Sequence, residues 1–481
     1  MRIYQGALAS LLLVAGVSAS VQAETLVRWD RERVPSPESL GLSTLVIPAT
    51  NAAAVRNALA HGYRLYLEVD ASALAGFIPP RAGVAGVVVK GAVSPARLRQ
   101  VRQRLQPRGI RVLALEERAK WPHIRSNWVT KNDEVLQVTG RSAQPWIENN
   151  AALLRILRAT ASAPAPVLTY AWEPITISER DEGPGIDDYL VAIAEAGSFG
   201  GDLVLPLHEQ FQKDLLLGKP QARAGWNQIR RYMDFYSWNL SSAYEPIANI
   251  GVVTADPIQW FEVMNLLLRH NLPFQRIAPA ALPLRAPHPF KLLIVLDPPD
   301  AARLEFLEEF ARQGGTVVLP GPSPESPGLP RRSAQREGGS LPRRSAQREG
   351  GLTTDERVSY RFGEGRVVEV MKGIADPNTF ALEMRQMLGP DHRVIDIWNG
   401  ITVLTAPHQE LQGSTVLVTA LNYAHDPLPV QLRVPGTFSL VHYESPEEPA
   451  ALLPYQHRNG FTEFVLPALH IGGRVFLTRA P

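Results

Sequence analysis

Two apolar runs in the first half of the chain each lead to a glutamate. Residues 167–172 (VLTYAW) are followed directly by Glu173, and residues 202–207 (DLVLPL) are followed by His208 and Glu209. Runs of this length and composition predict buried parallel strands, whose carboxyl ends meet at one rim of a barrel or sheet. Carboxyl groups gathered at such a rim could act as a general acid and a general base. The two glutamates are therefore the first candidate catalytic residues.

The chain around these runs alternates strand-like and helix-like segments from residue 24 to residue 243, which predicts a parallel β/α fold. Eight strands are expected, at residues 25–29, 44–48, 64–69, 86–90, 111–116, 134–139, 167–172 and 202–207. Helices are expected between most of them, at residues 52–60, 95–105, 147–160, 187–196 and 226–238. Gly197 is expected to stop the fourth of these helices. The pattern predicts an α/β fold that begins with a compact (β/α)8 TIM barrel.

Two further units are expected after the barrel. Residues 244–390 again alternate strand-like and helix-like segments, which predicts a small doubly wound α/β domain. Residues 391–481 show short β-rich runs separated by Asn, Pro and Gly, which predicts an antiparallel β-sandwich.

A tandem repeat interrupts the second unit. Residues 328–339 recur at 340–351 with one change, and the repeated segment is rich in arginine and has no apolar stripe. We expect residues 322–353 to form a disordered loop, because nothing in the segment offsets the entropy of ordering it. An arginine-rich arm that binds anions is the alternative.

Composition and the N-terminus limit the classes of function. The chain has no cysteine, which excludes disulfides, thiolate metal sites and cysteine nucleophiles, and a net charge of +2 gives no reason to expect nucleic acid as a partner. Arg2, the apolar residues 11–17 and the small residues before position 24 predict a signal peptide, residues 1–23, and a periplasmic or secreted protein without a membrane partner. An uncleaved membrane anchor is the alternative. No His or Asp follows His208 and Glu209 at ligand spacing, so neither a metal nor another cofactor is expected.

The order of units resembles that of multidomain glycoside hydrolases, especially the bacterial β-galactosidase family with an amidotransferase-like trimerisation domain. The motifs that carry the likeness are loose: GGTVVL at 314–319, GEGRVV at 363–368, LNY at 421–423 and LPAL at 466–469. The resemblance implies an oligosaccharide or polysaccharide substrate. It also implies that the second unit is structural or a homo-oligomer contact, because glutaminase chemistry in that fold needs a cysteine. One departure is that the fourth expected strand ends in Val89, Lys90 and Gly91, where the family has its acid/base glutamate. A diverged or catalytically inactive barrel is therefore an alternative.

Glycoside hydrolysis uses two carboxyl groups across the scissile bond. The resemblance gives Glu173, at the end of the seventh expected strand, the role of nucleophile. Glu209 is the nearest candidate acid, since burial beside Trp172 or His208 would raise its pKa. For both residues the alternative is a salt bridge at the rim. The substrate-binding candidates are the polar and aromatic residues at or after strand ends, namely Trp29, Asp30, Glu68, Asp70, Glu116, Trp121, Tyr170, Trp172 and His208.

Three functions are compatible with these residues. The first is a glycoside hydrolase that acts through Glu173 and Glu209. The second is a non-catalytic glycan-binding or assembly protein on a degenerate barrel. The third is an interaction protein that uses the sandwich or the arginine-rich repeat.

Overall fold

The computed structural model describes most of the chain after residue 23. It covers residues 24–80, 82–115, 123–124, 128–132, 135–139, 150–158, 165–172, 183–237, 240–284, 288–320, 347–348, 357–370, 373–374, 376–400, 402–424 and 426–479. Glu116, Trp121, Glu173, the expected signal peptide and most of the tandem repeat lie outside these residues. No helix in the described ranges combines the length and the apolar character needed to cross a membrane.

The first part of the chain forms a seven-stranded parallel sheet in the order β5-β4-β3-β2-β1-β11-β9. Its strands are β1 (Thr25–Arg28), β2 (Thr44–Pro48), β3 (Arg64–Asp70), β4 (Val84–Lys90), β5 (Arg111–Ala114), β9 (Val167–Thr169) and β11 (Asp202–Pro206). A parallel bridge joins Leu115, just after β5, to Val167 on β9. The same seam continues where β6 (His123–Ile124) pairs in parallel with β10 (Ala171–Trp172). The sheet therefore curls into a nearly closed barrel, and the expected fold class is confirmed.

The barrel is filled by side chains. A buried cluster takes residues from all seven strands and from the position after β5, namely Leu26, Val46, Tyr66, Val88, Leu113, Leu115, Val167 and Val204. Because side chains alternate across a strand, the residues two positions further on face the same interior. Those residues include Arg28, Glu68 and Lys90, which lie at the carboxyl rim.

One expected barrel strand lies elsewhere. β8 (Val135–Thr139) pairs antiparallel with β7 (Trp128–Asn132) in a separate two-stranded sheet. Two residues join β7 to β8, which is the connection length of a tight hairpin, whereas parallel neighbours need a long crossover. The strand was predicted correctly, but its partner was not, because this local pairing replaced a place in the barrel.

The barrel helices are α2 (Ala52–Ala60), α3 (Pro95–Leu105), α4 (Asn150–Leu157), α6 (Ile186–Phe199), α7 (Glu209–Leu216) and α8 (Pro220–Tyr236), with the short α1 (Pro37–Leu40). The expected stop of α6 at Gly197 was wrong, since the helix continues to Gly200 at φ 75°. Gly197 is instead a contact residue, because a Cβ there would lie 2.5 Å from the Tyr236 ring of α8. Its lack of a side chain lets α6 and α8 pack closely.

The second unit is a mixed sheet in the order β14-β13-β15-β16-β19-β18-β17. The first five strands are parallel and the last two pairings are antiparallel. The strands are β13 (Ile250–Val253), β14 (Phe274–Ile277), β15 (Leu292–Val295), β16 (Thr316–Pro320), β17 (Gln347–Arg348), β18 (Arg357–Phe362) and β19 (Gly365–Val370). Its helices are α10 (Phe261–Arg269), α11 (Ala301–Arg312) and α12 (Pro377–Leu388).

The C-terminal unit is a sandwich of two antiparallel sheets over a buried apolar core. The larger sheet has the order β12-β21-β22-β28-β24-β25 and the smaller one the order β20-β23-β27-β26. These strands are β12 (Tyr244–Pro246), β20 (Asp396–Ile397), β21 (Val403–Glu410), β22 (Thr415–Asn422), β23 (Leu428–Pro435), β24 (Leu440–Glu444), β25 (Ala451–Leu452), β26 (Tyr455–Arg458), β27 (Phe461–Leu469) and β28 (Gly472–Thr478). β12 follows the short α9 (Leu240–Ala243), so the chain joins the sandwich before it enters the second unit.

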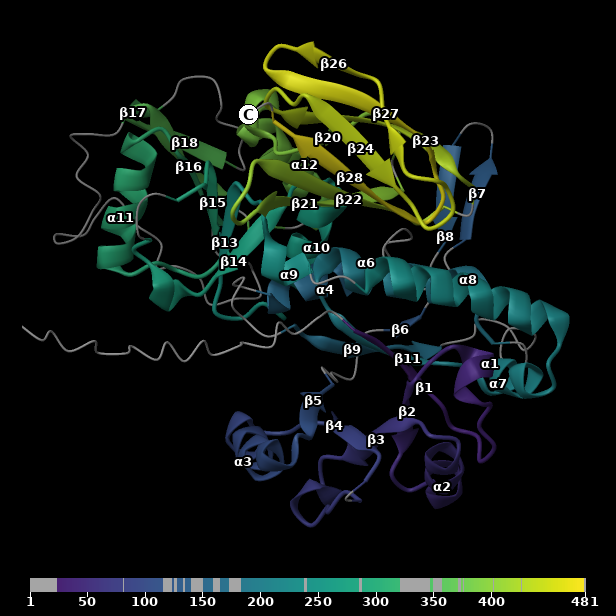
Figure 1. The fold of residues 1–481 in the computed structure, drawn as a ribbon. Helices are drawn as coiled ribbons and strands as arrows, with labels where there is room; N and C mark the ends of the chain where they lie inside the picture. The colour runs from purple at the N-terminus through teal and green to yellow at the C-terminus, as the bar shows by residue number, and fades with distance from the viewer. Residues whose placement is uncertain are drawn as a thin grey trace, which may run out of the picture.

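Helices α6 and α8 lie between the barrel and the sandwich (Figure 1). Glu195 on α6 is fully buried, and its carboxylate accepts hydrogen bonds from Tyr170 at 3.0 Å and from Tyr423 at 2.6 Å. Tyr170 connects β9 to β10, and Tyr423 follows β22. On α8, the Phe235 ring packs against the guanidinium of Arg474, and the Arg474 Cζ lies 3.7 Å from the centroid of that ring. The same two helices therefore cover the barrel and support the sandwich.

The amino-terminal end of the barrel is closed by charged groups. Arg111 binds Glu24 and Asp202, each at 3.1 Å, and the Glu24 backbone N–H donates to Asp202 at 2.9 Å. Asp202 has only 4% of its side chain exposed. Burial raises the pKa of Asp202 to about 6, against the opposing effects of the Glu24 backbone hydrogen bond and the Arg111 charge. Charges at this face of a barrel usually serve stability.

The Tyr423→Phe variant tests the link between barrel and sandwich. Removing the hydroxyl leaves the buried Glu195 carboxylate with one donor fewer, so we expect the free energy of unfolding to fall by about 1–3 kcal/mol. Urea denaturation measures it. Tyr455→Phe is the matched control, because its hydroxyl donates to the Ser439 carbonyl in an exposed hydrogen bond. A loss no larger than that of the control would contradict the proposed link.

The Asp202→Asn variant tests the charged end of the barrel. The pKa of Asp202 is raised in the folded state, so its stabilising contribution is complete below the unfolded pKa and is lost as pH rises through about 6. Asparagine cannot ionise. Between about pH 4 and about pH 7 the free energy of unfolding should therefore fall less in the variant than in the wild type. The expected difference is on the order of 2 kcal/mol.

Urea denaturation at the two pH values checks this difference. Asp234→Asn is the control, since Asp234 is 73% exposed and lies in a helical ion pair with Arg230. An identical pH dependence in wild type and Asp202→Asn would contradict the assignment.

Candidate functional site

A cluster of charged side chains occupies the carboxyl rim of the barrel. Arg28, the last residue of β1, donates from Nε and Nη2 to the two carboxylate oxygens of Glu68 on β3, at 2.7 and 3.0 Å. Its Nη1 binds Asp30 at 2.7 Å. The Glu68 side chain is 8% exposed and that of Asp30 is 40% exposed. One guanidinium therefore holds two carboxyl groups side by side, one buried and one open to solvent.

Backbone contacts fix the loop that carries Asp30. The backbone N–H groups of Asp30 and Arg31 donate to Oε1 of Gln212 at 3.0 and 3.3 Å, and Nε2 of Gln212 donates to the Leu207 carbonyl at 2.7 Å. Asn51 donates to the Asp30 carbonyl at 2.7 Å and also caps α2. Gln212 is buried on α7. The backbone of Asp30 is thus held from two helices, which limits the positions that its carboxyl group can take.

The surroundings of Asp30 favour its protonated form. Burial is the largest influence and raises its pKa, and the negative charge of Glu68 acts in the same direction. The charges of Arg28 and Lys90 and a hydrogen bond with Gln212 lower the pKa without cancelling the rise. Burial also opposes the charge on Arg28, yet the hydrogen bonds and charges of Glu68 and Asp30 outweigh it and raise the Arg28 pKa. Asp30 can therefore retain a proton at higher pH than an ordinary aspartate, as a general acid does.

Glu209 lies at the outer edge of the same rim. It is the first residue of α7, its side chain is 79% exposed, and its carboxylate binds Arg31 at 2.8 Å. His208 caps that helix, because its ring Nδ1 accepts a hydrogen bond from the Gln210 backbone N–H at 3.3 Å. The backbone N–H of His208 donates to the Tyr189 hydroxyl. Arg31 thus connects Glu209 to the Asp30 loop. Glu209 is therefore exposed, whereas burial beside Trp172 or His208 was expected.

Two aromatic candidates belong to the core. The Trp29 side chain is fully buried and its indole donates to the Arg33 carbonyl at 2.9 Å, while Tyr170 is buried against Glu195. Both pack with the helices around the barrel, because alternation places them on the outer face of their strands. They are therefore core residues, whereas substrate-binding positions were expected at both.

The remaining candidates divide into three groups. Asp70 ends β3 two positions after Glu68 and is exposed at the rim. Trp172 lies in β10, with only its backbone described. Glu173, Glu116 and Trp121 lie outside the described residues.

The sequence analysis missed Arg28, Asn51 and Gln212 as parts of the site. Arg28 had a signal, because it lies two residues after the inward-facing Leu26 on a strand that had been located. Asn51 and Gln212 had none, since their role depends on contacts between separate elements. Among the residues that the structure describes, no group of three or more His, Asp or Glu side chains could hold a metal ion.

Comparison with known proteins supports the fold. No family model and no curated protein matches the sequence. Among solved structures, α-L-fucosidase isoenzyme 2 from Paenibacillus thiaminolyticus matches with a TM-score of 0.55 and 10% identity, over 95% of this chain and 100% of that chain.

Two more distant structures are similar over parts of their length. A rhamnosidase from Novosphingobium sp. PP1Y has a TM-score of 0.47 and 13% identity, covering 80% of this chain and 38% of that one. A catalytic mutant of Gan42B, a GH42 β-galactosidase from G. stearothermophilus, has a TM-score of 0.40 and 10% identity, covering 89% and 66%. The match to the fucosidase confirms the expected structural similarity to glycoside hydrolases at the level of the fold.

Proposed function

We propose that the protein is a periplasmic or secreted glycoside hydrolase that cleaves a glycan at the carboxyl rim of its barrel. The observation that carries the proposal is the charged cluster at the carboxyl rim, where Arg28, itself bound to the buried Glu68, holds the solvent-accessible carboxyl group of Asp30. Glycosidases need one protonated and one ionised carboxyl group. Burial raises the pKa of Asp30, which favours this residue as the protonated member, and the proposal assigns the ionised role to Glu173.

In the proposed reaction Glu173 attacks the anomeric carbon while an acid protonates the leaving glycosidic oxygen. Water then attacks the glycosyl-enzyme bond, and the same acid, now ionised, accepts the proton from that water. Two residues compete for the acid role. Glu209 was the expected acid. Both residues are ion-paired, but Asp30 is the less exposed of the two, at 40% against 79%, and it has a raised pKa and a backbone fixed by hydrogen bonds.

The other rim residues have binding roles in this proposal. Asp70 and Lys90 end neighbouring strands and are exposed, so their side chains can bind sugar hydroxyls. Glu68 is buried and ion-paired, and it orients Arg28 and through it Asp30. The rim therefore has a buried supporting layer and an exposed layer that meets the glycan.

A non-catalytic glycan-binding or assembly protein is the second candidate. It is favoured by the ion pairs that occupy the described carboxyl groups, Arg28 with Asp30 and Glu68, and Arg31 with Glu209. It is also favoured by Lys90, which stands at the end of β4 where the resembling enzymes have their acid/base. A protein of this class would bind a glycan at the same rim and leave it intact.

The Glu173→Gln variant tests the hydrolase proposal. Residues 24–481 are assayed against aryl glycosides and a broad set of polysaccharides. We expect hydrolysis of at least one substrate, and a fall in kcat/KM of about 100-fold to 10,000-fold in the variant. Glu32→Gln is the matched control, because Glu32 is an exposed glutamate in the loop after β1. Binding without hydrolysis supports the second candidate, and unchanged activity in Glu173→Gln removes Glu173 from the mechanism.

The variants Asp30→Asn and Glu209→Gln identify the acid. Loss of the acid slows cleavage of poor leaving groups far more than cleavage of activated aryl glycosides. If Asp30 is the acid, its raised pKa places the basic limb of the kcat profile above the range of an ordinary aspartate, and Asp30→Asn removes that limb. We expect this result for Asp30→Asn and a smaller effect, independent of the leaving group, for Glu209→Gln. The reverse pattern would return the role to Glu209.

A further inference from the structure

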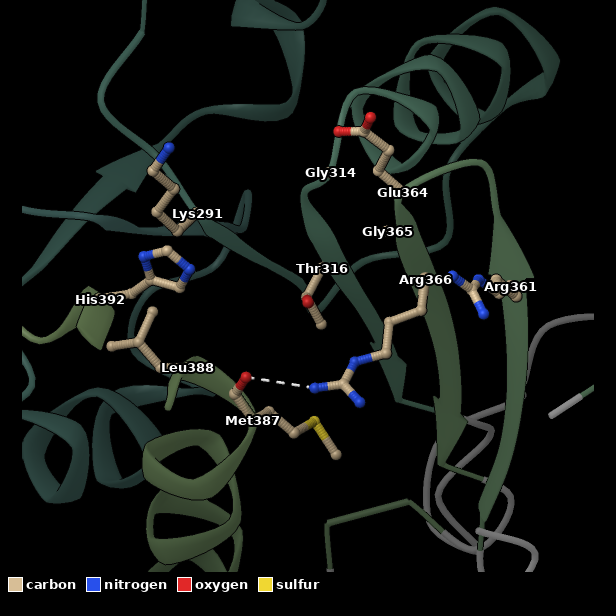
Figure 2. Close-up of a pocket in the computed structure, with 10 residues that line it drawn as sticks. All are labelled: Lys291, Gly314, Thr316, Arg361, Glu364, Gly365, Arg366, Met387, Leu388 and His392. Atoms are coloured by element: carbon tan, nitrogen blue, oxygen red, sulfur yellow. Dashed lines mark hydrogen bonds between the residues drawn. The ribbon is translucent and has the colours of Figure 1, made fainter. Parts of the chain in front are cut away.

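A polar pocket of about 360 Å³ opens at the edge of the second sheet, apart from the barrel rim (Figure 2). Its lining comes from the starts of β15, β16 and β19 and from the segment that ends α12 and leads to His392. Figure 2 shows Lys291 and His392 on one side of the opening and Thr316, Glu364 and Arg366 on the other. Ligands of doubly wound folds bind at the carboxyl ends of the strands. This pocket lies at the opposite, amino-terminal edge, so it is not the active site that the fold would suggest.

The lining carries an excess of positive charge. Lys291, Arg361 and Arg366 are cationic, and Glu364 is the one carboxylate that lines the pocket with them. Within the described part of the chain, none of the three cations forms an ion pair. Arg366 donates to the Met387 carbonyl at 3.2 Å, as Figure 2 shows, and Arg361 donates to the Gly363 carbonyl at 3.4 Å. An arginine has five N–H donors, so both guanidinium groups keep donors for a ligand.

Two of the cations come from opposite positions on neighbouring strands. Arg361 on β18 and Arg366 on β19 are directly opposite in the antiparallel register. Side chains at such a pair lie on the same face of the sheet, and like charges there destabilise it. An anion bound between them would reverse the sign of this interaction, since a charge-assisted hydrogen bond to a guanidinium is among the stronger polar contacts.

We propose that this pocket binds an oxyanion, a sulfate or phosphate group that is either free or an ester on a sugar. The forked donors of the two arginines match an anion with several oxygen acceptors, and the Thr316 hydroxyl and the Lys291 ammonium add donors at the start of neighbouring strands. The site is independent of the barrel and does not require the protein to be a hydrolase.

Thermal unfolding of residues 24–481 tests this site. The probes are sodium sulfate, sodium phosphate, galactose 6-sulfate and glucose 6-phosphate, each compared with sodium chloride of equal ionic strength. We expect at least one oxyanion to raise Tm by about 2 °C or more above the chloride reference. Stabilisation by the inorganic ions identifies a site for the free anion, and stabilisation by a sugar ester alone identifies a site for the ester. A response no larger than that to chloride would overturn the proposal.

The Arg361→Gln variant gives a second test, in which the expected change in Tm has opposite signs in chloride and in the oxyanion. In chloride we expect its Tm to exceed that of the wild type, because the like-charge pair is removed. In the stabilising oxyanion we expect its Tm increase to be lost. Lys291→Met should weaken the response, and Arg458→Gln, an exposed arginine on the sandwich, should leave it unchanged. A lower Tm of Arg361→Gln in chloride, or a full response in that variant, would overturn the proposal.

Discussion

The buried carboxylate of Glu195 is the interaction on which the arrangement of the units depends. Taking a charged group out of water is costly unless hydrogen bonds compensate it, and here two tyrosine hydroxyls from different units do so. Tyr170 directly precedes β10 at the barrel seam, so the same contact fixes the position of the chain where β10 begins. The barrel and the sandwich are therefore not independent domains on a linker. They share one layer of helices, and the seam of the barrel is held from the sandwich side.

The two ends of the barrel use the same chemical device for different purposes. At each end one arginine holds two carboxyl groups, Arg111 at the amino-terminal end and Arg28 at the carboxyl rim. Asp202, at the amino-terminal end, is almost inaccessible, whereas Asp30, at the rim, is two-fifths exposed. An accessible carboxyl group with a raised pKa can exchange a proton with a ligand, and an inaccessible one cannot. Exposure, more than the pKa shift, separates the candidate site from the structural cluster.

Local signals made part of the fold predictable. The bounds of α2 and α3 followed from the sequence because Asn51 and Ser94 cap them and Pro95 begins the second. Residues 134–139 were recognised as a strand, but strand character does not reveal the partner. Gly197 was predicted to stop a helix because glycine is common at helix ends. Its actual role, a close contact with Tyr236, joins elements distant in sequence and therefore gives no local signal. For the site, the ends of β1, β3 and β4 were located to within one residue. Which of Arg28 and Trp29 faces the interior depends on which face of β1 the barrel buries, and that requires the closed sheet.

The charges at the two candidate sites indicate different ligands. The described rim has three cationic residues, Arg28, Arg31 and Lys90, and four acidic ones, Asp30, Glu68, Asp70 and Glu209. Most of these charges are paired with one another. A rim of nearly balanced, mutually paired charges does not select a strongly charged ligand and suits a neutral polyhydroxylated chain, which forms hydrogen bonds to both kinds of group. The pocket of the second unit has an excess of cations, which form no ion pair with the residues that the structure describes, and it suits an anion.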